Sequence, residues 1–154
     1  MMYDQRPQKN YNTNKRPSAP AVVKKPPLDK LSYVKQAEKV IRDEISRDKR
    51  NPDKLELSTS QIRNILTMTN ELYNAVRFDN EEKLSEELRS HIQYIKMKIA
   101  YNAGRERIVK DFVEKSCLMQ YLDEVGDSRD KLIIFCHYAE ALVAYHKFYG
   151  GDDK

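Results

Sequence analysis

Two groups of basic residues are the part of this sequence whose types and spacing best suit a chemical role, the binding of phosphate groups. In the first group, two arginines share one flank of an expected helix with neutral hydrogen-bonding residues: Arg63, Thr67, Asn70, Asn74 and Arg77. A phosphate backbone offers many acceptor oxygens and rewards bidentate contacts from guanidinium groups. This group therefore predicts a surface that contacts a nucleic-acid backbone.

The second group surrounds the junction between two expected helices and contains Lys96, Lys98, Arg105, Arg107 and Lys110. Two of its arginines are placed at a helix N-terminus, where free backbone N–H groups and the helix dipole favour an anion. In the alternative interpretation, these residues only increase solubility and form ion pairs with Glu106, Asp111 and Glu114. Spacing alone leaves both interpretations open.

Residues able to catalyse a reaction or to hold a metal form no recognisable pattern. His137 and His146 lie nine residues apart on one expected helix, on roughly opposite sides of it, so they cannot share a ligand. His91 falls on the inner stripe of another helix and is expected to be a core histidine. The sequence contains no HExxH motif, no Cys/His set with metal-ligand spacing and no glycine-rich phosphate loop. It therefore predicts neither an enzyme nor a bound cofactor or metal.

The basic excess is concentrated at the N-terminus of the 154-residue chain. Residues 1–27 contain six Lys or Arg and one acid, which leaves 22 of the 28 basic and 23 of the 24 acidic residues for the remainder. Five of the six prolines also lie there, so we expect a disordered basic tail followed by a single helical-bundle domain over residues 28–154. The tail is either a solvated linker or a loose electrostatic arm for RNA. Any nucleic-acid surface on the nearly neutral domain must be a local patch.

The expected compartment follows from the apolar segments and the cysteines. No apolar run approaches the roughly 20 residues that span a bilayer, so no membrane contact is expected. Cys117 and Cys136 lack the spacing of a disulfide framework and are expected to be reduced, partly buried thiols. These features indicate a cytoplasmic protein.

Apolar residues recur at helical spacing from residue 28 onward, and no segment alternates with the period of a strand. We expect an all-α compact bundle of about five helices, over residues 28–49, 58–76, 81–103, 106–125 and 129–149. The first helix should bury a face made of Leu28, Leu31, Val34, Ile41 and Ile45.

Helix ends have local signals of their own. Ser58 and Gln61 fit a capping box at the start of the second helix. Gly104 and Gly126 are placed where helices end in the left-handed conformation, and Asp127 or Ser128 should cap the last helix.

Two helices carry more apolar surface than one buried face requires. The helix over residues 129–149 is apolar nearly all round, so it is either central in the bundle or packs on a neighbouring subunit. The helix over residues 81–103 has a second stripe of Tyr94, Met97 and Tyr101. That stripe suits core or partner contacts, or else stacking of RNA bases on the tyrosines.

Three stretches, residues 57–66, residues 101–106 with 109–115, and residues 135–151, resemble the small subunit of the type III-A (Csm) CRISPR effector. The C-terminal stretch FCHYAEALVAYHKFYGG is the most specific of them. The resemblance covers residues 51–153 well and the first helix loosely, and it does not cover residues 1–27. His137 stands where a more basic residue is expected in this motif.

The resemblance implies a non-catalytic helical subunit repeated along a ribonucleoprotein filament in antiviral defence. Its implied partners are further copies of itself, the crRNA-binding backbone subunits and the large polymerase-like subunit. It would hold the duplex of crRNA and target RNA by its backbone, without reading sequence. Within the matching stretches, this role falls on Arg63, Arg105 and Lys110; the other four basic residues rest on spacing alone.

Two other functions compete with this interpretation. A helical protein-interaction adaptor would use the apolar patches and would need no RNA contact from the arginines. A helical nuclease or other enzyme is the second alternative, although no motif supports it. Salt-dependent RNA binding that is lost on charge reversal at Arg63 and Arg105 would separate the subunit from the adaptor.

Overall fold

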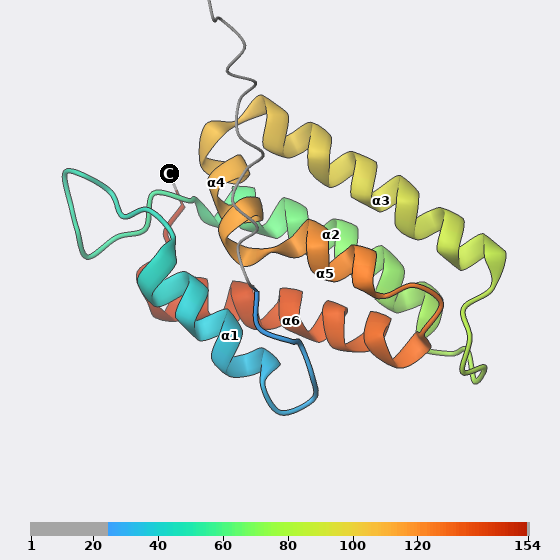
Figure 1. Cartoon of the computed structure of the whole chain (residues 1–154). Coiled ribbons are helices and arrows are strands. Elements are labelled where there is room, and N and C mark those ends of the chain that lie inside the picture. The colour runs from blue at the N-terminus through green and yellow to red at the C-terminus, as the bar shows by residue number, and fades with distance from the viewer. Residues whose placement is uncertain (1–24, 154) are drawn as a thin grey trace, which may run out of the picture.

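The computed structural model describes residues 25–153, and this part of the chain is helical (Figure 1). Its elements, in chain order, are α1 (Tyr33–Lys39), the π-helical turn η1 (Val40–Glu44), α2 (Thr59–Val76), α3 (Glu86–Arg105), α4 (Arg107–Ser116), α5 (Leu118–Glu124) and α6 (Arg129–Phe148). Within the described residues there is no strand, only two isolated bridges, Arg47 with Leu55 and Lys83 with Ser128. The all-α prediction is confirmed.

The expected disorder of the N-terminal tail falls almost entirely outside the described residues. Its last three residues, 25–27, are described, and they contact α5. The hydroxyl of Tyr121 donates to the carbonyl oxygen of Pro26 at 2.6 Å, and the ammonium group of Lys25 lies 5.0 Å from the centre of the same ring. The boundary at residue 27 stays a prediction. A truncation that tests it also removes the contacts of Lys25 and Pro26 with Tyr121.

Helix α6 packs against four other elements of the bundle, α1, η1, α2 and α5 (Figure 1). Its ring of buried side chains includes Leu132, Phe135, Tyr138 and Leu142. The structure therefore supports the first interpretation of its all-round apolar surface, a central position. Phe148 is the exception, because its side chain is 76% exposed at the end of the helix.

Serine side chains cap three helix starts, and the sequence predicts two of these caps, those of Ser58 and Ser128. Ser58 and Gln61 form a full capping box on α2: the Gln61 backbone N–H donates to Ser58 Oγ at 3.2 Å, and the Ser58 N–H donates to Gln61 Oε1 at 2.8 Å. Ser85 and Ser128 accept backbone N–H groups at the starts of α3 and α6. Gly126 has a φ of 56° and lies just beyond α5, as predicted for a left-handed helix end.

The predicted first helix, residues 28–49, is too long at both ends. Asp29 Oδ1 accepts the backbone N–H groups of Leu31 and Ser32 at 2.8 Å each, which forms a turn before α1 begins. Leu31, expected in the core, is 90% exposed, and Val34 is also exposed. At the other end, Ile45 is extended (φ −86°, ψ 155°), which ends the helix. The buried face consists of Ala37, Val40 and Ile41.

The segment between η1 and α2 folds back on residues 150–152. Leu55 and Leu57 are buried, and the Leu55 N–H donates to the Gly150 carbonyl at 3.3 Å. The Thr59 N–H, at the first residue of α2, donates to the Asp152 carbonyl at 3.1 Å. Gly150 has a φ of 98°, and a Cβ there would lie 2.2 Å from the Asp53 carbonyl oxygen, so this approach requires glycine. The start of α2 is thus fastened to the end of the described chain.

Two further helix boundaries differ from the prediction. The helix expected over residues 106–125 is broken at Cys117, whose φ of 57° is left-handed, so α4 and α5 can each turn an apolar face inward. Gly104, expected to be left-handed, lies inside α3 instead. That helix ends because Glu106 is extended (φ −132°, ψ 116°). Helix α3 also begins at Glu86 rather than at residue 81, because Ser85 supplies its cap.

Candidate nucleic-acid interface

Helices α2 and α3 are antiparallel neighbours, and their pairing sets the positions of the predicted basic residues. The side chains of Gln61 and Glu106 are hydrogen-bonded, and Asn102 Nδ2 lies 3.9 Å from the sulfur of Met68. This alignment brings Arg63 and Arg105 to the same end of the helix pair. Since a helix rises 1.5 Å per residue, the next predicted arginine on α2, fourteen residues on, stands about 21 Å away at the other end.

The first predicted group is retained as an exposed flank of α2. Arg63, Asn74 and Arg77 are exposed, and Asn70 is half-buried. Arg63 forms no ion pair with any of residues 25–153, and Thr67 Oγ1 donates to its backbone carbonyl at 2.9 Å. The guanidinium carbon of Arg77 lies 4.4 Å from the centre of the exposed Phe78 ring. Both arginines remain open to an anion in solution.

The second predicted group is divided by the fold. Lys96 pairs with Asp123 of α5 at 2.5 Å, whereas Lys98 faces α2 and lies 3.6 Å from Glu71. Arg107 pairs with Glu56 at 3.2 Å. These three residues thus form ion pairs, as the alternative interpretation expects of the group, and an RNA contact at them stays a prediction.

The acids in those pairs are not the ones expected. Glu106 binds Gln61, and Asp111 accepts from the Ser46 hydroxyl at 3.3 Å. The partners that the structure provides come from other elements of the fold, α2, α5 and the segment before α2.

Arg105 and Lys110 complete the second group. Arg105 is the last residue of α3, and its guanidinium carbon lies 5.5 Å from the centre of the Tyr101 ring. Lys110 is exposed one turn into α4. The N-cap of α4 is Glu106, whose carboxylate stands at the terminus expected to attract an anion. A carboxylate at this helix N-terminus disfavours an anion there, so the basic character of this region comes from the side chains of Arg105 and Lys110.

The expected roles of the histidines need correction. His91 is half-buried rather than in the core; its ring stacks on Tyr94 at 6.3 Å and its Nε2 lies 3.8 Å from Glu71. The core histidine is His146, whose burial lowers its pKa. The ring of His137 lies between those of Tyr33 and Tyr73, at 6.1 and 5.7 Å. The helical pattern misled because α3 turns His91 toward α2 and away from the bundle centre.

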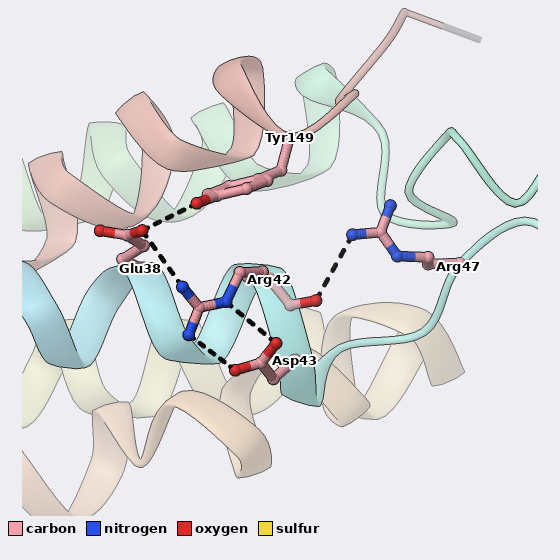
Figure 2. A network of polar contacts seen from close by, with 5 residues as sticks. All are labelled: Glu38, Arg42, Asp43, Arg47 and Tyr149. Atoms are coloured by element: carbon pink, nitrogen blue, oxygen red, sulfur yellow. Dashed lines mark hydrogen bonds and ion pairs between the residues drawn. The ribbon is translucent and has the colours of Figure 1, made fainter.

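A polar network that the sequence did not indicate joins η1 to the end of α6 (Figure 2). Tyr149 donates its hydroxyl to Glu38 at 2.8 Å, and Arg42 NH1 lies 3.4 Å from the same carboxylate. Arg42 also binds both oxygens of Asp43 at 3.0 Å, and its carbonyl accepts from Arg47 at 3.4 Å. Hydrogen bonding to Arg42 lowers the pKa of Asp43. Because these charges satisfy one another, the network joins structural elements, and Arg42, unlike Arg63, is paired with acids.

Neither a metal site nor a membrane-spanning helix is found in the described part of the chain. No group of three or more His, Cys, Asp or Glu side chains among residues 25–153 could hold a metal ion. No described helix is both long enough and apolar enough to cross a bilayer. Cys117 and Cys136 are both buried and free, and burial raises the pKa of each thiol, that of Cys136 to about 12.

Comparison with known proteins decides the family. A model of the Csm2 Type III-A family matches residues 34–152, which include every helix of the bundle except the first residue of α1. The chain belongs to the Csm2 family of type III-A CRISPR systems. The resemblance found in the sequence motifs is thereby confirmed, and this Csm2-family chain is a type III-A small subunit.

Relatives from several bacteria support the assignment. The protein named "CRISPR system Cms protein Csm2" from Mycobacterium tuberculosis (strain CDC 1551 / Oshkosh) is 40% identical over 122 residues, which cover 79% of this chain and 94% of the relative. The protein of the same name from Streptococcus thermophilus is 41% identical with the same coverage. That from Enterococcus italicus is 42% identical over 95 residues, covering 60% of this chain and 68% of the relative. Most of the described Csm2-family bundle lies within these matches.

Proposed function

We propose that this chain is a non-catalytic small subunit that contacts the backbone of crRNA and target RNA within a type III-A CRISPR ribonucleoprotein in the cytoplasm. The observation that carries the proposal is the position of Arg63 and Arg105 at one end of the α2–α3 pair. Both are exposed, and neither forms an ion pair with any described residue. Guanidinium groups that are free of acids suit phosphate contacts that hold a duplex without reading its sequence.

The partners that we propose rest on the family assignment, since the structure contains this chain alone. They are the Csm backbone subunits, the large polymerase-like subunit and further copies of this chain. Repetition along a filament requires two different surfaces on each copy. Guide pairing reads sequence in RNA-guided effectors, so a subunit beside the duplex needs phosphate contacts and no base code.

Reconstitution of the complex with charge-reversed subunits tests the RNA contact. Arg63→Glu with Arg105→Glu should weaken capture of RNA by the assembled complex and flatten its salt dependence, which is about −0.7 in log–log slope per phosphate neutralised on a single strand. Lys35→Glu with Lys39→Glu is the matched control, because it makes the same change in charge on α1. Capture equal to wild type in the Arg63/Arg105 variant would place the contact elsewhere or favour the protein-interaction adaptor. A purified chain that cuts RNA by itself would contradict the non-catalytic role.

A further inference from the structure

An aromatic and basic stripe runs along the exposed edge of α3. It consists of His91, Tyr94, Lys98, Tyr101 and Arg105, whose alternating spacing of three and four residues places them on one helix face. The tyrosine side chains are unusually open for rings of this size, with 52% of Tyr94 and 65% of Tyr101 exposed. Neither phenol hydroxyl has a hydrogen-bond partner within residues 25–153. Half or more of each tyrosine is therefore open to solvent, although the Tyr94 ring also stacks on His91 of the same helix.

Each tyrosine of the stripe is paired with a cation. Lys98 Nζ lies 5.5 Å from the centre of the Tyr94 ring, and the guanidinium carbon of Arg105 lies 5.5 Å from that of Tyr101. The two pairs repeat after seven residues, which corresponds to about 10 Å along the helix. A nucleotide has the complementary parts, a flat base joined through its sugar to a phosphate. A ring with an adjacent cation can therefore contact both parts of one nucleotide.

The charge distribution favours an anionic partner over an apolar one. From residue 88 to Arg105, α3 contains no acidic residue. One acid of a neighbouring helix borders the stripe: Glu71 Oε1 lies 3.6 Å from Lys98, and Glu71 Oε2 lies 3.8 Å from His91. At the other end of the stripe, Arg105 forms no ion pair with any described residue, and the carboxylate of the adjacent Glu106 is hydrogen-bonded to Gln61.

We propose that this stripe binds unpaired RNA bases by stacking on Tyr94 and Tyr101, in addition to the backbone contacts proposed above. The inference rests on the proposed function, since it assumes that RNA reaches the α2–α3 face. It adds a distinct specificity. Backbone contacts accept a paired strand, whereas stacking on these rings requires bases that are free of a partner strand. Nucleotides left unpaired beside the guide–target duplex would be retained by this edge of α3.

Binding of the full chain to two labelled oligoribonucleotides of equal length tests the inference. One has normal unpaired bases and the other is abasic, so both offer the same phosphates. Wild type should bind the normal strand several-fold more tightly than the abasic one. Tyr94→Ala with Tyr101→Ala should remove this difference and leave the abasic affinity unchanged. Tyr94→Phe with Tyr101→Phe should retain it, because the rings remain.

The outcomes separate this inference from the proposed function. Equal binding of the two strands by wild type, or an unchanged preference in the double alanine variant, would overturn base stacking while salt-dependent binding of both strands still supported the backbone role. Failure of the isolated chain to bind either strand would also overturn stacking, and capture by the assembled complex would then decide the backbone role. If the alanine variant retained its base preference but no longer copurified with other Csm subunits, the stripe would be a protein interface. The circular dichroism spectrum of each variant should match that of wild type, which would exclude loss of helical structure as the cause.

Discussion

The buried ring of His146 is hydrogen-bonded through Nε2 to the backbone carbonyl of Leu57 at 2.6 Å, across 89 residues of sequence. Because a carbonyl oxygen only accepts, Nε2 carries the hydrogen in this neutral ring. Burial lowers the pKa of His146, and the charge of Lys147 lowers it further, although the bond to Leu57 opposes them. The folded state therefore favours the neutral histidine.

This pKa shift predicts a loss of stability in mild acid. The unfolded chain takes up a proton on this residue near pH 6.5, whereas the folded chain resists it until a lower pH. The free energy of unfolding should therefore fall as pH decreases below about 6.5 and should be insensitive to this group above it. Urea unfolding between pH 5 and 8 measures the effect. His146→Gln should remove the slope in this range, whereas the control His91→Asn should keep it.

Gly104→Ala should stabilise the protein, since Gly104 lies within α3 and a Cβ there would meet nothing within 4 Å. The expected gain is about 0.5–1 kcal/mol, the usual difference between the two residues inside a helix. Gly126→Ala is the matched control and should destabilise, because its φ of 56° is left-handed. Thermal unfolding of both variants provides the comparison, and destabilisation by Gly104→Ala would mean that α3 ends before this residue.

Gly151→Ala should be clearly destabilising even though Gly151 does not have a left-handed φ, because the added Cβ has no space. A Cβ at this position would lie 2.1 Å from ring atoms of His146, which is itself buried. We expect a loss on the order of 1–3 kcal/mol from overpacking. When His146 is already replaced by alanine, Gly151→Ala should cost less than it does in the wild-type protein, because the ring no longer occupies the space that the new Cβ needs. Purely additive losses would show that the ring and Gly151 do not compete for space.

The contact between Tyr121 and Pro26 predicts non-additive effects at the tail boundary. Tyr121→Phe removes the hydrogen bond to the Pro26 carbonyl and should cost about 1 kcal/mol. A truncation that begins at Leu28 removes the same acceptor and should cost a similar amount. Tyr121→Phe in the truncated chain should then add almost nothing. Fully additive losses in chemical unfolding would show that the bond does not stabilise the fold. The pKa of Tyr121, raised to about 12 by burial, keeps the hydroxyl protonated at neutral pH.

Glu71→Gln should strengthen RNA binding by the isolated chain. The substitution removes the carboxylate that faces Lys98 and His91, so both become available to phosphates. A gain of up to about fivefold in affinity is expected, with a steeper salt dependence. Glu140→Gln makes the same change in charge on α6 and should have a smaller effect. Weaker binding by the Glu71 variant would contradict the assignment of the α2–α3 face to RNA.

Features set by neighbouring residues could be predicted from the sequence. The capping box at Ser58 and the left-handed Gly126 depend on residues within one turn, and both were predicted correctly. Ile92, Ile95 and Ile99, which recur at helical spacing in α3, are also buried. The break at Cys117 carried no such signal, because a left-handed cysteine is held in place by tertiary packing and not by its own preference.

The sequence could predict which basic residues lie on exposed helix faces, but it could not predict which of them form ion pairs with acids of other helices. Arg63 and Arg105 are open as expected, whereas Lys96 is neutralised by Asp123, which lies 27 residues away on another helix. The pairing of Arg107 with Glu56 spans 51 residues. Such partners depend on which helices become neighbours, and the helical period of a single segment does not contain that information. The same limit explains why His91, the predicted core histidine, is half-buried while His146 is the buried one.

The closure of the segment before α2 by residues 146–152 has a consequence for the order in which the protein can fold during synthesis. Leu55, Leu57 and Thr59 obtain hydrogen-bond partners from residues that are translated about 90 positions later. The central helix α6 also lies in that late part of the chain. During synthesis, α2 and α3 therefore lack both these hydrogen-bond partners and α6, and their apolar faces stay exposed. The complete bundle forms only after residue 152 has emerged, and the nascent chain is most vulnerable to aggregation and proteolysis in that interval.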